Sequence, residues 1–230
     1  MTSNLGRDYE VSVPDLKQWS CGLYTESMDR KLDSAGVFMY GSKLNYQRNM
    51  GYIGYDFFRD YDFLRCMTTY ATLGTGSLKI GNGQRSGSCA QYGVGAHFNL
   101  LDKDILDPTL AEDKIRVTAG VEYIASNPSV DTSGFGFDKQ SISFDELSGS
   151  LIVSFVNDIE GDKTFLPFGL SVFAGLLYSD FITNSHDLKA DSQLGYIAGL
   201  EVFYTESISF FLAAENIGSS GYTAGVDIHF

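Results

Sequence analysis

The histidines and cysteines are the side chains of this sequence best suited to catalysis or metal binding. The chain contains three of each: His97, His186 and His229, and Cys21, Cys66 and Cys89. Their wide spacing matches no zinc-binding motif and no disulfide framework. No GxSxG nucleophile elbow is present, and the glycine-rich stretch at 74–87 contains no GxxxxGK[ST] phosphate-binding loop. We therefore predict no catalytic, metal or cofactor site and no enzyme activity.

The composition of the 230 residues favours an all-β protein. The chain has 25 Gly, 14 Tyr and 17 Phe but only 4 Pro, which suits many strands joined by turns. Its mean hydropathy is −0.06, and no apolar run reaches the length of about 18 residues that a transmembrane helix needs. A formal net charge of −13 argues against binding to a nucleic-acid backbone.

Long segments of alternating apolar and polar residues predict strands that have one apolar and one polar face. Ten such segments are each about 8 to 13 residues long. Soluble proteins use strands of about five or six residues, whereas a tilted membrane-spanning strand needs about 9 to 11. The predicted strands cover residues 18–28, 36–46, 62–73, 90–100, 115–123, 147–155, 166–178, 194–204, 208–215 and 221–230. Residues 1–17 read as a polar tail or cap, and 18–230 as one barrel domain.

The apolar rows of several predicted strands end in aromatic residues, as with Tyr196 and Tyr204 on one strand. Aromatic residues at both ends of an apolar row are typical of strands that cross a membrane. In the second predicted strand, Leu44 and Tyr46 lie on the apolar face and Lys43 lies on the polar face. In the third predicted strand, Thr68 and Tyr70 lie on the outward face and Arg65 lies on the polar face.

The last ten residues carry the most specific pattern. Tyr222, Val226, Ile228 and Phe230 belong to one apolar row that ends at the terminal residue. This aromatic-terminated strand resembles the final strand of small bacterial outer-membrane β-barrel proteins, such as the opacity-type group. The resemblance implies an all-β fold: an up-and-down antiparallel transmembrane β-barrel of about ten strands, with eight or twelve as alternatives.

The same resemblance implies a location in the bacterial outer membrane, with outer-membrane lipid and the barrel-assembly machinery as partners. Tyr222, Val226, Ile228 and Phe230 would form the assembly signal. No signal peptide is recognisable before Asn4, and we expect it to have been removed from the exported protein. The sequence does not identify an extracellular partner, and it predicts no cofactor.

Charged side chains on the polar faces of the predicted strands should point into the lumen. There they would pair with one another and plug a narrow barrel. The seven predicted lumen charges are Glu26, Lys43, Arg65, Arg116, Glu122, Glu201 and Asp227. With its lumen plugged, the barrel would serve a structural, surface-exposed or attachment role.

Three alternatives remain open at this point. The lumen could instead form a narrow pore for ions or small solutes. A soluble lipocalin-like barrel would turn the same apolar rows inward and bind an apolar ligand. Finally, His186 beside Asp187 resembles the His/Asp pairs of ten-stranded outer-membrane proteases, but the other acidic residues that such enzymes need are not recognisable here.

Overall fold

A computed structural model of the chain describes residues 19–33, 43–57, 67–80, 84–85, 87–106, 112–130, 140–141, 144–158, 169–183, 189–190, 193–205 and 207–230. The predicted tail at 1–17 lies outside these residues. In the described part of the chain, no helix is long and apolar enough to cross a membrane.

The described residues form ten long strands and four short ones. The short strands, of two residues each, are β4 (Gln84–Arg85), β7 (Ser129–Val130), β8 (Gln140–Ser141) and β11 (Lys189–Ala190). The long strands are β1 (Trp19–Asp33), β2 (Lys43–Phe57), β3 (Met67–Ile80), β5 (Cys89–Leu106), β6 (Glu112–Ser126), β9 (Phe144–Asp158), β10 (Gly169–Thr183), β12 (Leu194–Thr205), β13 (Ile208–Asn216) and β14 (Ser220–His229).

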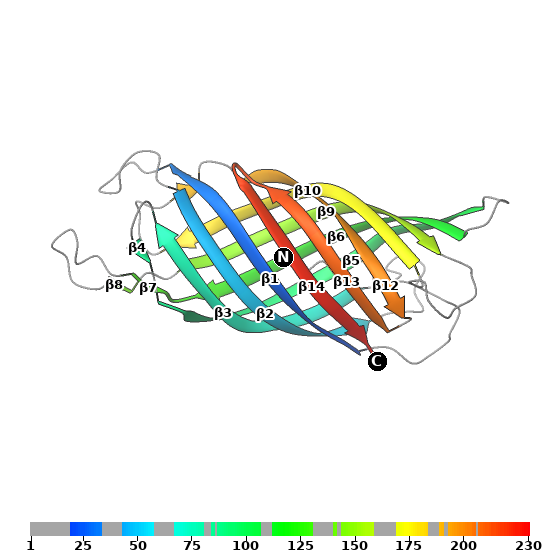
Figure 1. Cartoon of the computed structure of the whole chain (residues 1–230), viewed down its shortest axis with the longest axis horizontal. Coiled ribbons are helices and arrows are strands. Elements are labelled where there is room, and N and C mark those ends of the chain that lie inside the picture. Colours follow the sequence, from blue (N-terminus) through cyan, green and yellow to red (C-terminus); the bar gives the residue numbers. More distant parts are fainter. Residues whose placement is uncertain are drawn as a thin grey trace.

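The long strands close into a barrel. Each pairs antiparallel with the long strand that follows it in the sequence, and β14 returns to pair with β1 (Figure 1). Two backbone hydrogen bonds extend this closing seam to the C-terminus. The Trp19 amide donates to the Phe230 carbonyl (3.2 Å), and the Phe230 amide donates to the Trp19 carbonyl (3.0 Å). The prediction of a ten-stranded up-and-down antiparallel barrel is confirmed.

The barrel has two distinct ends, which we call the C-terminal end and the far end. The C-terminal end holds Phe230 and the start of β1, whereas the far end holds β4, β7 and β8 (Figure 1). At the far end, β13 and β14 are joined by a tight turn in which Gly218 has a φ of 71°. L-residues with side chains rarely adopt this left-handed conformation, so a glycine suits the turn.

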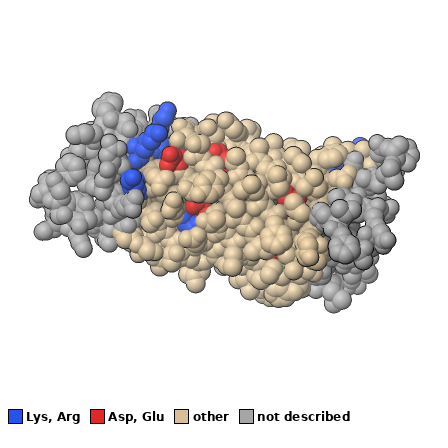
Figure 2. Space-filling view, viewed as in Figure 1, with Lys and Arg blue, Asp and Glu red and all other residues tan. Residues whose placement is uncertain are grey.

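The two faces of the wall differ as the alternation predicts. Large apolar side chains such as Leu23, Val153 and Leu212 are exposed on the outside, while their sequence neighbours point inward and are buried. In Figure 2 most of the visible wall is free of charged residues. The predicted faces are confirmed for β1, β5, β6, β9, β10, β12 and β14.

The predictions for β2 and β3 are wrong in part. β2 covers Lys43–Phe57 and so continues past the predicted end at residue 46, while β3 runs on to Ile80, past the predicted end at residue 73. The predicted segments 36–42 and 62–66 lie outside the described residues. Leu44, Tyr46 and Tyr70, predicted to face outward, are buried inside the barrel. The reason is that buried apolar clusters also line the inside of these strands: Leu44 and Tyr46 belong to one cluster, and Tyr70 belongs to another. Apolar character therefore does not mark the outer face in this region.

Candidate functional site in the barrel interior

The first candidate site is a set of four buried charges, Glu26, Arg30, Arg48 and Glu146, which we call the lumen cluster. Glu26 on β1 lies directly opposite Arg48 on β2, because the register of these strands pairs the two residues. The Arg48 Nε atom is 3.6 Å from Glu26 Oε2. The Tyr46 hydroxyl, on the same face of β2, donates a hydrogen bond of 2.7 Å to Glu26 Oε1.

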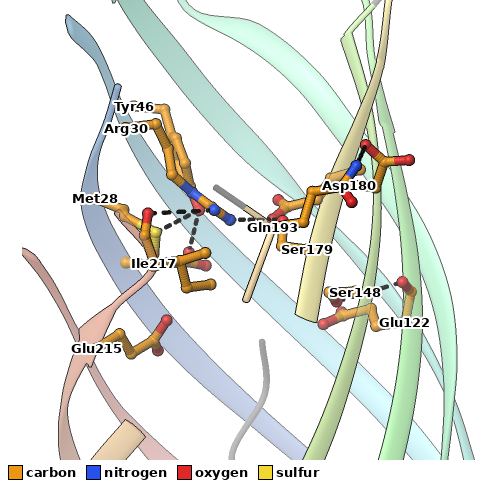
Figure 3. Close-up of polar contacts among 12 residues, drawn as sticks. Met28, Arg30, Tyr46, Glu122, Ser148, Ser179, Asp180, Gln193, Glu215 and Ile217 are labelled. Atoms are coloured by element: carbon orange, nitrogen blue, oxygen red, sulfur yellow. Dashed lines mark hydrogen bonds and ion pairs between the residues drawn. The ribbon is translucent and has the colours of Figure 1, made fainter. Parts of the chain in front are cut away.

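Glu146 brings the opposite wall of the barrel into this cluster. It lies on β9, which is five strands from β1 in either direction around the ten-stranded ring. Even so, Arg30 Nη2 on β1 is 3.5 Å from Glu146 Oε1, and Arg48 Nη2 forms an ion pair with Glu146 Oε2. The Ser179 hydroxyl on β10 donates to Glu146 Oε1 at 2.5 Å. These contacts span the lumen from wall to wall. Figure 3 shows two of the residues involved, Arg30 and Ser179, on opposite sides of the interior.

Aromatic rings pack beside the lumen cluster on its far side. The ring of Tyr46 on β2 meets the ring of Phe181 on β10 edge-on, with a centroid separation of 6.2 Å. The Arg30 guanidinium lies 4.9 Å from the Phe181 centroid, and that of Arg48 lies 4.5 Å from the Tyr46 centroid. Both arginines therefore combine ion pairing with cation–π contact, which is strongest where water is excluded.

The lumen cluster is electrically balanced, with two arginines and two carboxylates. Arg30 is 1% exposed and Glu26 is 2% exposed. Burying an isolated charge is costly, but buried charges are tolerated when partners and hydrogen bonds satisfy them. The arrangement is suited to holding opposite walls together. Among the described residues, no group of histidine, cysteine or acidic side chains is placed to hold a metal ion.

A second set of buried polar residues lies nearer the C-terminal end. The Tyr52 hydroxyl on β2 donates to Asp227 Oδ1 on β14 at 2.5 Å, reaching across β1. Gly22 on β1 is paired with both residues and makes this reach possible. A Cβ atom added at Gly22 would lie 2.6 Å from Asp227 Oδ1 and would also collide with the Tyr52 ring.

Glu201 belongs to the same set. Its Oε1 atom accepts a hydrogen bond of 2.5 Å from the Ser209 hydroxyl on the neighbouring strand, β13. The side chain is completely buried, and the charges of Asp227 and Arg116 both act on it. Two carboxylates and one arginine therefore lie within electrostatic range of each other.

Five of the seven predicted lumen charges lie where the sequence places them. Those that are buried inside the barrel are Glu26, Arg116, Glu122, Glu201 and Asp227. Lys43 is a correction: it lies on the outward face of β2 and is exposed. It was misassigned because the predicted second strand was shifted and its faces were exchanged. Arg65 lies outside the described residues.

Sequence reasoning missed three members of the lumen cluster. Arg30 and Arg48 lie between the predicted strands 18–28, 36–46 and 62–73, so the alternation assigned neither of them to a face. Glu146 directly precedes a predicted strand, and extending the alternation from Ser148 back by two residues would have placed it inside. Tyr222, Val226, Ile228 and Phe230 lie along the outward-facing row of β14, as predicted. Their role in assembly stays a prediction.

The outer wall carries aromatic residues toward both ends of the barrel. The far end has the exposed tyrosines Tyr92, Tyr123, Tyr178, Tyr196 and Tyr222. The C-terminal end has Trp19, Phe57, Tyr204, Phe210 and Phe230. Aliphatic side chains occupy the wall between the two sets. This outward distribution contradicts the lipocalin-like alternative, which requires the apolar rows to face inward.

The chain was also compared with known proteins. No family model matches it, and no curated protein sequence matches it. Among solved structures, the transport unit of the autotransporter AIDA-I from Escherichia coli is 10% identical, with 96% of this chain and 92% of that chain covered and a TM-score of 0.45. An outer-membrane channel from Pseudomonas putida F1 is 8% identical, with coverage of 94% and 96% and a TM-score of 0.43.

The outer-membrane protease OmpT from Escherichia coli is 11% identical, with 93% of this chain and 96% of that chain covered and a TM-score of 0.36. These neighbours are bacterial outer-membrane β-barrels. The chain's own strand pairing and surfaces show a closed ten-stranded antiparallel β-barrel with an apolar exterior and a charged interior spanned by side-chain contacts.

Proposed function

We propose that this protein is an integral outer-membrane β-barrel with a structural, surface-exposed or attachment role and a lumen closed by its own side chains. The C-terminal end would face the periplasm, and the far end would face outside. Outer-membrane lipid would surround the wall, and the barrel-assembly machinery would read the row that ends at Phe230. In this proposal the protein is not an enzyme.

The wall supports the membrane part of the proposal. Exposed aliphatic side chains such as Ile53, Val172 and Leu200 are costly in water but favourable in hydrocarbon. The aromatic residues at either end are suited to the two interfaces, where an apolar ring body meets a polar boundary. A closed barrel also leaves no unpaired strand edge in lipid.

The contacts of Glu146 are the single observation that carries the closed-lumen part. A side chain on β9 that pairs with Arg30 and Arg48 from the opposite wall occupies the path that a solute would take. The Tyr46–Phe181 contact, from β2 to β10, crosses the same region. The competing proposal is a narrow pore, in which these contacts would separate to admit an ion.

Conductance in planar lipid bilayers tests the closed lumen. We expect the purified protein to give small or undetectable currents, because the cross-lumen ion pairs hold the walls together. The double variant Arg48→Ala with Glu146→Ala removes one ion pair of the lumen cluster and should increase the frequency of channel openings. The matched control is Leu151→Ala, which shortens an outward side chain on the same strand as Glu146 and should leave the trace unchanged.

Two results would overturn the proposal in different ways. Large, steady currents from the unaltered protein would favour the pore. A folded protein that stays in solution without detergent would remove the membrane assignment itself. Each variant should first be shown to be folded by its altered gel mobility before heating, so that a loss of structure is not mistaken for a change in conductance.

A further inference from the structure

Three lysines gather on the outer face of the barrel at its far end. Lys31 on β1 lies directly opposite Lys43 on β2, and both are exposed. Lys79 on β3 is paired with Asn45, one outward-facing position along β2 from Lys43. Figure 2 shows basic side chains together at this end of the visible face. We call Lys31, Lys43 and Lys79 the basic patch.

Among the described residues, the lysines of the basic patch outnumber the carboxylates beside them, since Asp29 is the one described acidic side chain in the same rows. Within the described part of the chain, none of its lysines takes part in an ion pair. The carboxylate nearest in register, that of Asp29, accepts a hydrogen bond of 2.6 Å from Asn45. Like charges placed directly opposite on neighbouring strands destabilise a sheet. An anion bound between them would remove this repulsion.

Below the lysines, the outer face of the same three strands is polar rather than apolar. One cross-strand row consists of Ser27, Gln47 and Ser77, and the next toward the C-terminal end consists of Thr25, Asn49 and Thr75. All six side chains lie on the outward face. Only the following row, which contains Leu23 and Leu73, meets the apolar wall. Hydroxyl and amide groups thus cover the outer face between the hydrocarbon level and the basic patch.

The far end is different on the opposite wall. There, Asp145 on β9 accepts a hydrogen bond of 2.8 Å from the Tyr123 hydroxyl, and Asp180 on β10 accepts one of 2.6 Å from Gln193. The opposite wall of the far end therefore carries carboxylates at β9 and β10, where β1–β3 carry the basic patch. In a chain of net charge −13, it is also a local exception. Screening limits its action to about 10 Å at 0.1 M salt, so its ligand must lie against these strands.

We propose that the basic patch and the two polar rows bind the phosphorylated sugar headgroup of a glycolipid in the outer leaflet. The lysines would contact phosphate, and the hydroxyl and amide rows would contact sugar hydroxyls, with the acyl chains lying along the apolar wall below. This inference rests on the proposed outer-membrane location and on the far end facing outside.

Binding of defined lipids to the purified full chain in detergent micelles tests the proposal. The probes are a diphosphorylated disaccharide lipid, the same lipid without phosphates, phosphatidylglycerol and inorganic phosphate. The variant is Lys31→Gln with Lys43→Gln and Lys79→Gln. A basic residue near an anionic surface contributes about fivefold in affinity, so the triple variant should bind the diphosphorylated lipid roughly 100-fold more weakly. Lys103→Gln, an exposed outward lysine near the C-terminal end of β5, is the matched control and should bind normally.

The probes separate the possible sources of the phosphate. Tight binding of the diphosphorylated disaccharide lipid alone supports the proposal, and its loss in the triple variant locates the site. Equal binding of phosphatidylglycerol or inorganic phosphate would overturn the role of the sugar-facing rows. Equal affinity of the triple variant and the unaltered protein would overturn the basic patch as the site. A barrel that folds in detergent yet binds no glycolipid refutes this inference alone, whereas a barrel that needs no detergent refutes the proposed location.

Discussion

Replacement of Leu200 by arginine tests the depth of the barrel wall in a membrane. Leu200 faces outward on β12, four residues from Tyr196 and four from Tyr204, which lie toward opposite ends of the wall. At about 3.4 Å per residue and a strand tilt of roughly 40°, the two tyrosines are about 21 Å apart along the barrel axis. Leu200 therefore lies near the middle of the proposed hydrocarbon layer.

An arginine near the bilayer midplane costs about 2 to 4 kcal/mol, and the cost falls to about 0 to 1 kcal/mol near the interface. Leu194 provides a matched control, because it is an exposed leucine on the same face of the same strand, beyond Tyr196. We expect Leu200→Arg to lower the free energy of unfolding by roughly 2 to 3 kcal/mol more than Leu194→Arg, since only depth differs between the two changes.

The measurement is reversible unfolding by denaturant in lipid vesicles, followed by tryptophan fluorescence. The chain has a single tryptophan, Trp19, whose exposed ring lies on the outer wall near the C-terminal end, away from both leucines. Its emission therefore reports insertion without interference from the substitutions. Equal penalties at Leu200 and Leu194 would refute the assignment of β12 as a membrane-spanning strand.

Three further predictions follow from the seam, the close approach at β1 and the lumen cluster. Deleting Phe230 should reduce the heat-modifiable protein recovered in the membrane fraction, whereas His229→Ala should change it little; normal insertion without Phe230 would remove the assembly role. Gly22→Ala should lower the free energy of unfolding by about 1 to 3 kcal/mol, because the added methyl group would overpack the contact with Tyr52 and Asp227. Gly87→Ala is the control, since the added methyl group there meets open space, and equal effects of the two changes would contradict the close approach at Gly22. Arg48→Met should cost about 3 to 5 kcal/mol in the same denaturant experiment because it leaves buried carboxylates underpaired, and a cost below about 1 kcal/mol would show that the cluster contributes little to stability.

The local pattern of the sequence was enough to predict the architecture. Strict alternation assigns the two faces of a strand, because successive side chains point to opposite sides of a sheet. Where the outer face is continuously apolar, as at Leu170, Val172 and Leu176 on β10, this reading is confirmed. The lengths of the alternating segments predicted ten membrane-length strands, and the row ending at Phe230 correctly indicated the outward face of the last one.

The same reasoning failed where the apolar residues changed sides. At the far ends of β2 and β3, the interior holds Leu44, Tyr46 and Leu78, while polar rows and Lys43 lie outside. Alternation alone cannot tell an apolar core from an apolar outer wall, since both give a period of two. Closure of the barrel and the cross-strand register decide which of the two alternating sets of side chains faces the lumen.

The lumen cluster depended on tertiary structure most of all. The sequence separates the members of this cluster by up to 116 positions, from Arg30 to Glu146. No local sequence pattern therefore indicates that Arg30, Arg48 and Glu146 meet. They meet because ten strands place β9 directly across from β1 and near the opposite side from β2, at a height set by the register of every pair in between. Local sequence determines which way a side chain points, but the strand number and register of the closed barrel determine which side chain it meets.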